Sequence, residues 1–598
     1  MNMELKRSLV FWSVLCSASI AFADVRLPKS FSDHMVLQRD QPIHVWGWAG
    51  PGEEVAVQFG GQNVSGVAGR DGAWRVTLNP MKANPAPQDL VVTGKNTVKL
   101  TDILMGDVWM ISGQSNAAFS LGGCKAPEDI SAANFPLIRF SGYWEHFAGV
   151  PQPDGGASWK VMSPGSAEGC TGIGFYFARK VQPQSGTPIG LLTCAVGGTS
   201  IENWMSLDAV NNYPENASVA KEYQKEIARW ERELSLSRAT PGQRPAWYAV
   251  DEPIGLELAI PWLTQVRSGL SIRSTPPDPS FTDLESWVNA AHTALGAHGP
   301  VPAQPEFETV GKWLQTTSLP VNLKRIPILP HPTDRNGVGG HGWFRTATLY
   351  NGMIYPLLPF GIKGMLWYQG ENGSGNAYYD RMRSMVETMR KDKRQDFPVY
   401  IVQLPGFGTP SVDPSGGDIQ NFPITREQQL KCLQLPRTGV AVTIDVGDAI
   451  DLHPRNKQDV GERLALLALA KDYGQDIVCS GPLFKEAKMV DGKIRIGFDS
   501  IGGGLMIGKK DGTNPVVEDK PGKLQQFSIA GADKQWFRAD AVIDGSSVVV
   551  SSPDVPAPVA VRYAFSMNPQ GCNLYNKQGL PAAPFRTDRW NDTSLSRH

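Results

Sequence analysis

Ser115 is a candidate nucleophile because of the segment that carries it. Residues 108–111 form a short apolar run suited to a buried parallel strand, and the turn-forming sequence Ser-Gly-Gln-Ser-Asn follows at residues 112–116. A serine at such a strand end is accessible, and the backbone N–H groups beside it can hold the oxyanion that forms in acyl transfer. Because Gly-Gln-Ser-Asn alone is more often an ordinary turn, the assignment needs a base and further donors elsewhere in the chain.

His453 is the candidate base. A serine hydroxyl needs a base, usually a histidine held by a carboxylate, and the chain has nine histidines. His453 follows the last predicted parallel strand, in the sequence Asp-Leu-His-Pro, and Asp451 can turn back onto its ring. Pro454 disfavours helix at His453. A surface histidine beside a helix cap is the alternative, but the shared sheet edge with Ser115 favours a catalytic pair.

Two further strand ends offer oxyanion donors. The sequence Ala-Val-Gly-Gly-Thr-Ser at residues 195–200 has glycines whose backbone can approach a ligand closely. The sequence Trp-Tyr-Gln-Gly-Glu-Asn at residues 367–372 offers amide side chains that can donate. Singly, these segments are a tight turn and a polar strand end. Three polar strand ends at one edge of a sheet instead predict a site.

The elements that must position these residues alternate between strand and helix. Apolar runs suited to strands covered on both faces occur at residues 108–111, 189–195, 362–368, 399–404 and 440–446. Helical sequence lies between them, at residues 377–394 and 456–473. This alternation predicts an α/β fold with a doubly wound parallel sheet, whose ligand site lies beyond the carboxyl ends of its strands.

The chain of 598 residues is too long for one core, and its patterns predict several parts. Short strands with Gly and Pro turns favour β-sandwich-like domains at residues 24–102 and 476–598. The catalytic domain occupies residues 103–205 and 346–475. An insertion at residues 206–345 separates its halves and has predicted helices at 219–236 and 284–295. It emerges near the sheet's end, which predicts a lid or a substrate wall.

Residues 1–23 read as a secretory signal. Lys6 and Arg7 supply positive charge, an apolar segment too short to span a bilayer follows, and Ala21-Phe22-Ala23 fits a cleavage site. The prediction is a secreted or periplasmic protein, whose environment permits disulfides. Of the six cysteines beyond this segment, Cys124 and Cys170 are candidates to pair near the site.

Composition excludes several classes of partner. Lys and Arg number 57 against 58 Asp and Glu, so no net charge favours nucleic acid or an anionic membrane surface. No Cys/His group has metal-ligand spacing. The sequence therefore predicts an enzyme with no metal and no other cofactor, no nucleic-acid partner and no membrane partner.

These motifs resemble the sialate O-acetylesterase family, within the SGNH-type carbohydrate esterases. The resemblance extends over residues 27–39, 42–48, 351–356, 573–576 and 579–581 as well as the motifs above. It implies Ser115 as nucleophile, His453 as base and then acid, and Asp451 as its orienting carboxylate. It also implies oxyanion donors from the backbone of Ser115 and Gly198 and from the Gln369 amide. The supporting residues would be Gln114, Asn116, Glu371 and Asn372.

The predicted function is a secreted serine esterase that removes O-acetyl groups from carbohydrates through an acetyl-serine intermediate. The substrate is an acetylated oligosaccharide or polysaccharide: hemicellulose such as xyloglucan or xylan, or O-acetylated sialic acid. A sialate carboxylate needs an arginine and a neutral glycan needs stacking aromatics. The candidates are Trp144, Trp204, Trp343, Arg345 and Arg455.

The chain departs from the family in two places. It has Ala117 where the family commonly has a methionine, and its insertion is rich in Pro and Trp. Both departures bear on substrate choice. The rival class is a non-catalytic carbohydrate-binding protein with a degenerate esterase domain.

Overall fold

A computed structural model describes most of the chain. It covers residues 24–148, 151–211, 256–272, 276–296, 308–319, 323, 346–373, 375–415 and 421–590. The predicted signal segment, the predicted helix at residues 219–236, and the candidates Trp343 and Arg345 lie outside these residues. Within them, no helix is both long and apolar enough to cross a bilayer.

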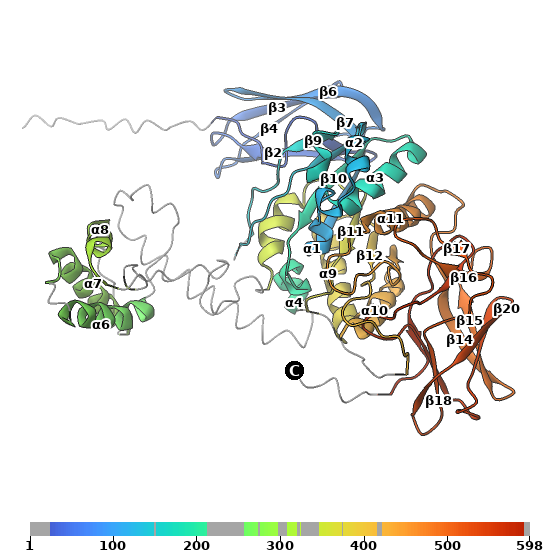
Figure 1. The fold of residues 1–598 in the computed structure, drawn as a ribbon. Helices are drawn as coiled ribbons and strands as arrows, with labels where there is room; N and C mark the ends of the chain where they lie inside the picture. Colours follow the sequence, from blue (N-terminus) through green and yellow to red (C-terminus); the bar gives the residue numbers. More distant parts are fainter. Residues whose placement is uncertain are drawn as a thin grey trace, which may run out of the picture.

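The central sheet has the strand order β13-β12-β11-β7-β10-β8-β9. Figure 1 labels β7, β9, β10, β11 and β12 of this sheet. All neighbouring pairs from β13 to β8 are parallel, and β9 adds an antiparallel edge strand. The strands are β7 (Thr97–Gly113), β8 (Phe135–Ser141), β9 (Trp159–Met162), β10 (Ile189–Ala195), β11 (Gly364–Tyr368), β12 (Val399–Val402) and β13 (Thr438–Ala441).

Helices cover both faces of this sheet. Trp109 and Ile111 of β7 belong to one buried cluster with helices α3 (Gly172–Ser185) and α11 (Lys457–Asp472). Met110, between them, belongs to another cluster with α9 (Tyr378–Lys393). Successive side chains of a strand point to opposite faces, so the continuous apolar runs follow from double coverage. The predicted α/β class is confirmed, and the two predicted helices correspond to α9 and α11.

The N-terminal β region shares a strand with the central sheet. Its strands are β1 (Val36–Gln38), β2 (Ile43–Trp48), β3 (Glu54–Phe59), β4 (Gln62–Val67), β5 (Ala73–Leu78) and β6 (Asn84–Thr93). Strand β7 pairs with β6 and β1 in its first part and with β10 and β11 in its second. The predicted boundary at 102/103 therefore falls inside one continuous strand, which fixes the N-terminal region against the strand that leads to Ser115.

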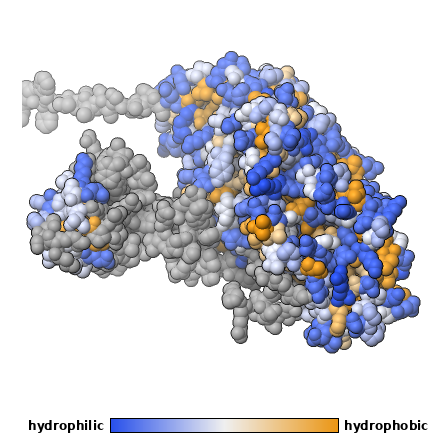
Figure 2. Space-filling model, in the orientation of Figure 1, coloured by the Kyte–Doolittle hydropathy of each residue, from blue (hydrophilic) through white to orange (hydrophobic). Residues whose placement is uncertain are grey.

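The C-terminal part is again made of strands, as predicted. Its sheets have the orders β14-β15-β21-β20, β17-β16-β23 and β19-β18-β22-β24. The strands are β14 (Leu483–Val490), β15 (Lys493–Asp499), β16 (Leu505–Lys509), β17 (Val517–Glu518), β18 (Phe527–Ala530), β19 (Trp536–Arg538), β20 (Asp540–Asp544), β21 (Ser547–Ser551), β22 (Ala560–Tyr563), β23 (Leu574–Asn576) and β24 (Phe585–Arg586). The face shown in Figure 2 is mainly hydrophilic, with apolar residues in small separate groups.

The last central strand is shorter than predicted. The apolar run at residues 440–446 predicts a strand of that length, but β13 ends at Ala441. Val442 and Ile444 are buried in the core of the C-terminal β region instead. The apolar run at residues 440–446 is therefore longer than the strand because its last part is buried in a second core.

Most of the described part of the insertion is a helical group, drawn apart from the central sheet in Figure 1, whereas its first helix, α4 (Leu207–Asn211), lies against α9. Helices α6 (Leu256–Ile272), α7 (Pro279–Gly296) and α8 (Glu308–Thr316) share their own core, which includes Trp262 and Phe281. The predicted helix at residues 284–295 lies within α7. The remaining helices are α1 (Ser115–Ala118), α2 (Pro127–Ser131) and α10 (Asn421–Lys431).

Arg426 of α10 joins the central sheet to the C-terminal region. Its guanidinium is fully buried and donates to the main-chain carbonyls of Leu404, Pro405, Ser566 and Met567.

Arg426→Met would leave these buried carbonyls without their donor, so we expect the free energy of unfolding to fall by about 3 kcal/mol or more. Urea unfolding measures the change. Arg538→Met, at an exposed arginine, is the control and should shift stability by less than about 0.5 kcal/mol; equal effects would contradict the assignment.

Candidate active site

Ser115 and His453 are in direct contact although 338 positions separate them. Ser115 is the first residue of α1, which follows β7, and His453 lies between β13 and α11. The Ser115 Oγ lies 2.8 Å from the His453 Nε2. Both residues are half-buried, so the pair is supported by the fold and still open to solvent. This is the hydrogen bond through which an imidazole can take a proton from an attacking serine.

Asp451 faces the other ring nitrogen of His453. Its Oδ1 lies 3.5 Å from the Nδ1, longer than a direct hydrogen bond, and accepts the backbone N–H of His453 at 2.8 Å. The backbone bond turns the carboxylate toward the ring. Catalytic hydrogen bonds of this type are often long in free enzymes and shorten when substrate is bound. The orienting role of Asp451 stays a prediction with compatible geometry.

A sharp turn at Gly113 places Ser115 at the sheet edge. Gly113 has a φ of +129°, and a Cβ there would lie 2.1 Å from the carbonyl oxygen of Tyr368. Only glycine fits this position. The next residue, Gln114, donates its backbone N–H to the same carbonyl at 3.0 Å. The chain thus leaves β7 against the end of β11, and the Ser115 hydroxyl emerges beside the following loop.

The loop after β10 lies against Ser115. A Cβ at Gly197 would be 3.4 Å from the Ser115 Cβ, and Gly198 is exposed with a φ of +74°. Among the residues that the structure describes, the backbone N–H groups of Ser115 and Gly198 donate to no protein acceptor. Two unpaired donors beside a nucleophile suit an oxyanion site, so the sequence-based choice of Gly198 has compatible geometry.

Gln369 is positioned differently from the sequence-based expectation. Its side chain is fully buried, and its Nε2 faces the Gln114 Oε1, the Thr199 carbonyl and the Asn372 carbonyl at 3.2, 3.3 and 2.5 Å. An amide nitrogen has two hydrogens, and these three acceptors occupy them. Gln369 therefore fastens the loops after β7, β10 and β11 to one another, and this geometry does not fit a donor to substrate.

Asn372 lies closer to solvent in the same network. Its Nδ2 donates to the Gly198 carbonyl at 2.8 Å, and its backbone N–H donates to the Gln114 Oε1 at 3.3 Å. The Gln114 amide oxygen thus accepts from both Asn372 and Gln369. Asn372 is half-buried, so its amide reaches the open side of the site while it fixes the Gly198 loop. Gln114 and Asn372 therefore join the loops after β7, β10 and β11.

Asn116 and Glu371 also contact one another. The Asn116 Nδ2 donates to the Glu371 Oε1 at 2.5 Å and to the Leu452 carbonyl at 3.0 Å. The other Glu371 carboxylate oxygen is buried and has no hydrogen-bond partner among the described residues. Burial raises the pKa of Glu371, and the Asn116 hydrogen bond and the charge of Lys457 oppose that rise. The bond to Leu452 links the residue after Ser115 to the residue before His453.

Two residues of the site were missed by the sequence analysis. The Phe119 ring stacks on the His453 ring, with centroids 5.9 Å apart and planes 11° from parallel. Lys457, the first residue of α11, is buried beside both. A cation in the first turn of a helix is unfavourable for the helix dipole, and this unusual placement four residues after His453 is the signal that could have indicated Lys457.

The candidate substrate-binding residues divide into exposed and buried ones. Arg455 is exposed, two residues from His453, which fits a contact with substrate. Trp144 is half-buried and donates its indole N–H to the Thr193 carbonyl in β10 at 3.0 Å. Trp204 is fully buried against Trp367 and bonds the Thr199 hydroxyl, so it has no free face for a sugar and does not fit the predicted role.

Cys124 and Cys170 are both buried as free thiols, so the structure does not contain the disulfide considered from the sequence. Burial raises the pKa of the Cys124 thiol to about 11 and that of Cys170 still further. Neither thiol is therefore a nucleophile near neutral pH. Within the described residues, no group of His, Cys, Asp and Glu side chains could hold a metal ion.

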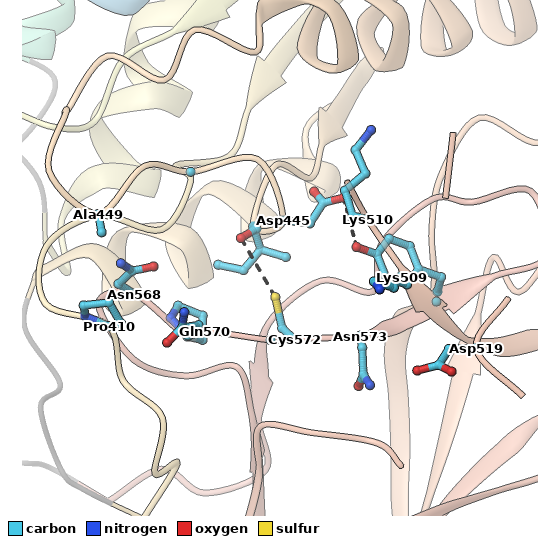
Figure 3. A pocket seen from close by; sticks show the side chains of 16 residues that line it. Pro410, Asp445, Ala449, Lys509, Lys510, Asp519, Asn568, Gln570, Cys572 and Asn573 are labelled. Carbon is cyan, nitrogen blue, oxygen red and sulfur yellow. Dashed lines mark hydrogen bonds between the residues drawn. The ribbon is translucent and has the colours of Figure 1, made fainter. Parts of the chain in front are cut away.

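A cavity of about 430 Å³ lies between the loop after β13 and the C-terminal β region (Figure 3). Asp445 and Ala449 line it from the loop, and Cys572 and Tyr575 line it from the other side. Within it, the Tyr575 hydroxyl donates to Asp445, and the Cys572 thiol donates to the Ile444 carbonyl. These contacts support the loop that carries His453.

Known proteins resemble this chain over most of its length. A family model described as carbohydrate esterase, sialic acid-specific acetylesterase matches residues 105–237 and 335–470. A solved carbohydrate acetylesterase from Xanthomonas citri is 30% identical, with a TM-score of 0.66, over 95% of this chain and all of that one. The chain belongs to the sialic acid-specific acetylesterase family. Sialate O-acetylesterases of Mus musculus and Homo sapiens are 25% and 22% identical over 96% of the chain, and over 96% and 94% of their own lengths.

Membership in this family makes the protein a carboxylic ester hydrolase that removes O-acetyl groups from carbohydrates. The matched segments contain Ser115 in the first part and Asp451 and His453 in the second. The gap between the two parts falls within the predicted insertion.

Proposed function

We propose that this esterase acts through an acetyl-serine intermediate. Ser115 attacks the acetyl carbonyl while His453 takes the hydroxyl proton, and a tetrahedral oxyanion forms. The sugar alkoxide then leaves and receives that proton from His453. Water, deprotonated by His453, then attacks acetyl-Ser115. The bond between the acyl carbon and the Ser115 Oγ breaks, acetate leaves, and His453 returns the proton to the Ser115 Oγ. The observation that carries the proposal is the 2.8 Å contact between the Ser115 Oγ and the His453 Nε2.

Three donors would stabilise the oxyanion. The backbone N–H groups of Ser115 and Gly198 are unpaired among the described residues and lie on adjoining loops. For the third donor we choose the Asn372 amide in place of Gln369. Asn372 donates one amide N–H to the Gly198 carbonyl, and its side chain is half-exposed. Gln369 is fully buried, and its amide hydrogens already face three acceptors. A donor must reach the reacting oxygen, and only Asn372 has that access.

The substrate we favour is an acetyl ester on a neutral polysaccharide such as acetylated xyloglucan or xylan. The His453 and Asp451 side chains are 35% and 46% exposed, so the pair lies at an open edge rather than in a closed pocket. An open edge can receive an acetyl group carried on a long chain.

O-acetylated sialic acid is the second candidate. Arg455 is exposed beside His453 and can pair with a sugar carboxylate. Curated relatives of the chain are sialate O-acetylesterases.

The setting of this activity is also part of the proposal. We infer export to the periplasm or the exterior from the signal-like residues 1–23. We also infer that residues 103–205 and 346–475 form one SGNH-type catalytic domain interrupted by the insertion. The strand order and the two helical layers support that arrangement.

Replacement of the nucleophile tests the mechanism. Ser115→Ala should lower acetate release from p-nitrophenyl acetate by at least about 1000-fold, because the covalent path is lost. A fluorophosphonate probe should label the natural protein at Ser115 and should not label the variant. Circular dichroism controls for folding. A folded variant with full turnover would remove Ser115 from the mechanism.

Paired variants distinguish the two amides. Asn372→Ala should lower kcat by about 100-fold, since a transition-state donor is lost. Gln369→Ala should lower the thermal midpoint more than Asn372→Ala does, because it takes the buried donor away from the carbonyls of Thr199 and Asn372. Steady-state kinetics and thermal unfolding of both variants check this. If Asn372→Ala keeps its kcat, the amide donor is assigned wrongly.

A substrate panel decides between the two carbohydrate classes. We expect faster acetate release from acetylated xyloglucan or xylan than from O-acetylated sialic acids. Arg455→Ala should leave hydrolysis of the neutral polymers within about twofold, because these substrates carry no carboxylate for the guanidinium. Preference for sialic acids, together with a loss of that activity in Arg455→Ala, would instead establish the second candidate.

A further inference from the structure

Lys457 is a buried charge next to the Ser115–His453 pair. Its side chain is 1% exposed, and its ammonium donates to the Asn116 Oδ1 at 2.7 Å and to the Pro454 carbonyl. The ammonium also lies 4.7 Å from the centroid of the Phe119 ring and 5.8 Å from that of Tyr368. Two oxygen acceptors and two aromatic rings thus surround a cation that makes no direct salt bridge with a described carboxylate.

Asn116 transmits this contact to a carboxylate. Its Oδ1 accepts from Lys457, and its Nδ2 donates to Glu371 and to the Leu452 carbonyl. The amide is fully buried, and these three bonds use both of its hydrogens and its oxygen. Cation, amide and carboxylate therefore form one chain of charge-assisted hydrogen bonds, which are stronger than neutral ones. A second amide conformation would break all three.

The chain of bonds connects the two reacting residues through their neighbours. Asn116 directly follows Ser115 in the sequence, and the carbonyls of Leu452 and Pro454 flank His453 on both sides. Phe119 adds a third connection, because it contacts both the His453 ring and the Lys457 ammonium. The relative position of the two segments therefore depends on the Lys457 ammonium.

We propose that Lys457 is a positioning residue for acyl transfer, whose ammonium holds Asn116 and the Pro454 carbonyl so that Ser115 and His453 remain in hydrogen-bond contact. Lys457 itself touches no substrate. The inference rests on the proposed function, because it assumes that this pair performs the chemistry. Misplacement of a reacting group by about 1 Å can lower a rate by about 100-fold, so a residue of this kind influences kcat.

The protonation state of Lys457 gives this role a pH dependence. Burial lowers the pKa of Lys457 to about 8, and the carboxylates of Glu371 and Asp451 oppose that shift. Cys124 also faces Lys457, but its thiol has a pKa of about 11 and is uncharged at this pH. Below pH 8 the ammonium is charged and its hydrogen bonds are charge-assisted. Above pH 8 the amine is neutral, those bonds weaken, and the hold on both segments loosens. We therefore expect kcat to decline on the alkaline side.

Kinetics of two Lys457 variants test the inference. Lys457→Met keeps the apolar stem and removes the charge, so kcat for p-nitrophenyl acetate should fall by about 100-fold, with KM within about twofold. Its kcat should show no decline between pH 7 and pH 9.5 after subtraction of spontaneous hydrolysis. Lys457→Arg keeps a cation that does not deprotonate in this range, and should retain more activity than Lys457→Met and also lack the alkaline decline.

Lys471→Met is the matched control. Lys471 lies on the same helix and also donates to a main-chain carbonyl, that of Thr438, but it is exposed and far along the helix from His453. Its kcat and pH profile should match those of the natural protein. This comparison separates a loss of helix stability from a loss of positioning.

The outcomes are distinct. The inference is overturned if Lys457→Met keeps a kcat within twofold and an unchanged pH profile, even where its thermal midpoint falls. If that variant does not fold, the dependence of kcat on pH in the natural protein and in Lys457→Arg decides. A decline of kcat at alkaline pH in both proteins overturns the inference, and a decline that is absent from Lys457→Arg supports it.

Ser115→Ala is measured in parallel. Full activity there refutes the proposed function, whereas an inactive Ser115→Ala with a fully active Lys457→Met refutes the positioning role alone.

Discussion

Parallel pairing of β10, β7 and β11 is the constraint on which the site depends. In this register Ala195 and Tyr368 both lie opposite Gly113, so the three strands end at one level. Loops that begin side by side can share hydrogen bonds, and Ser115, Gly198 and the residues after Tyr368 are brought together by the backbone before any side chain acts. The register is fixed by apolar side chains on both faces of the sheet, because a shift would move Trp109 and Met110 into the wrong cores.

Neutral amides then fix the loops to one another. Gln114, Gln369, Asn372 and Asn116 each bond across from one strand end to another. An amide offers two donors and an acceptor without the desolvation cost of a charge, so several can be buried at one edge of a sheet. Few ionisable side chains therefore need to be buried beside these amides. Lys457 and Glu371 bond to the two ends of the Asn116 amide, and the Ser115–His453 pair lies beside them.

Much of this arrangement could be predicted from sequence because strand ends are marked by abrupt changes from apolar to polar residues. That signal gives the α/β class, the strand that precedes Ser115 and the loop that carries His453. It does not give side-chain direction within a loop: Gln369 and Asn372 are three residues apart with the same chemistry, and only the path of the chain after β11 buries one and leaves the other half-exposed. The predicted length of β13 was wrong because Val442 and Ile444 are buried in the core of the C-terminal β region. Lys457 has one sequence signal, a cation in the first turn of a helix, but its burial follows only from the packing of α11 against α3 and β13.

The C-terminal β region supports the loop that carries His453. Arg463 of α11 holds Asp445 in the loop after β13, and Tyr575 of the β region donates to the same carboxylate. At the start of α11, Asn456 donates to the Gly512 carbonyl, and Lys510 pairs with Asp459 at 2.6 Å. The loop that carries His453 is therefore held at its beginning and at its end by residues from a different part of the chain. A histidine that must meet a serine 338 positions away needs a rigid loop, and packing against a second core supplies it.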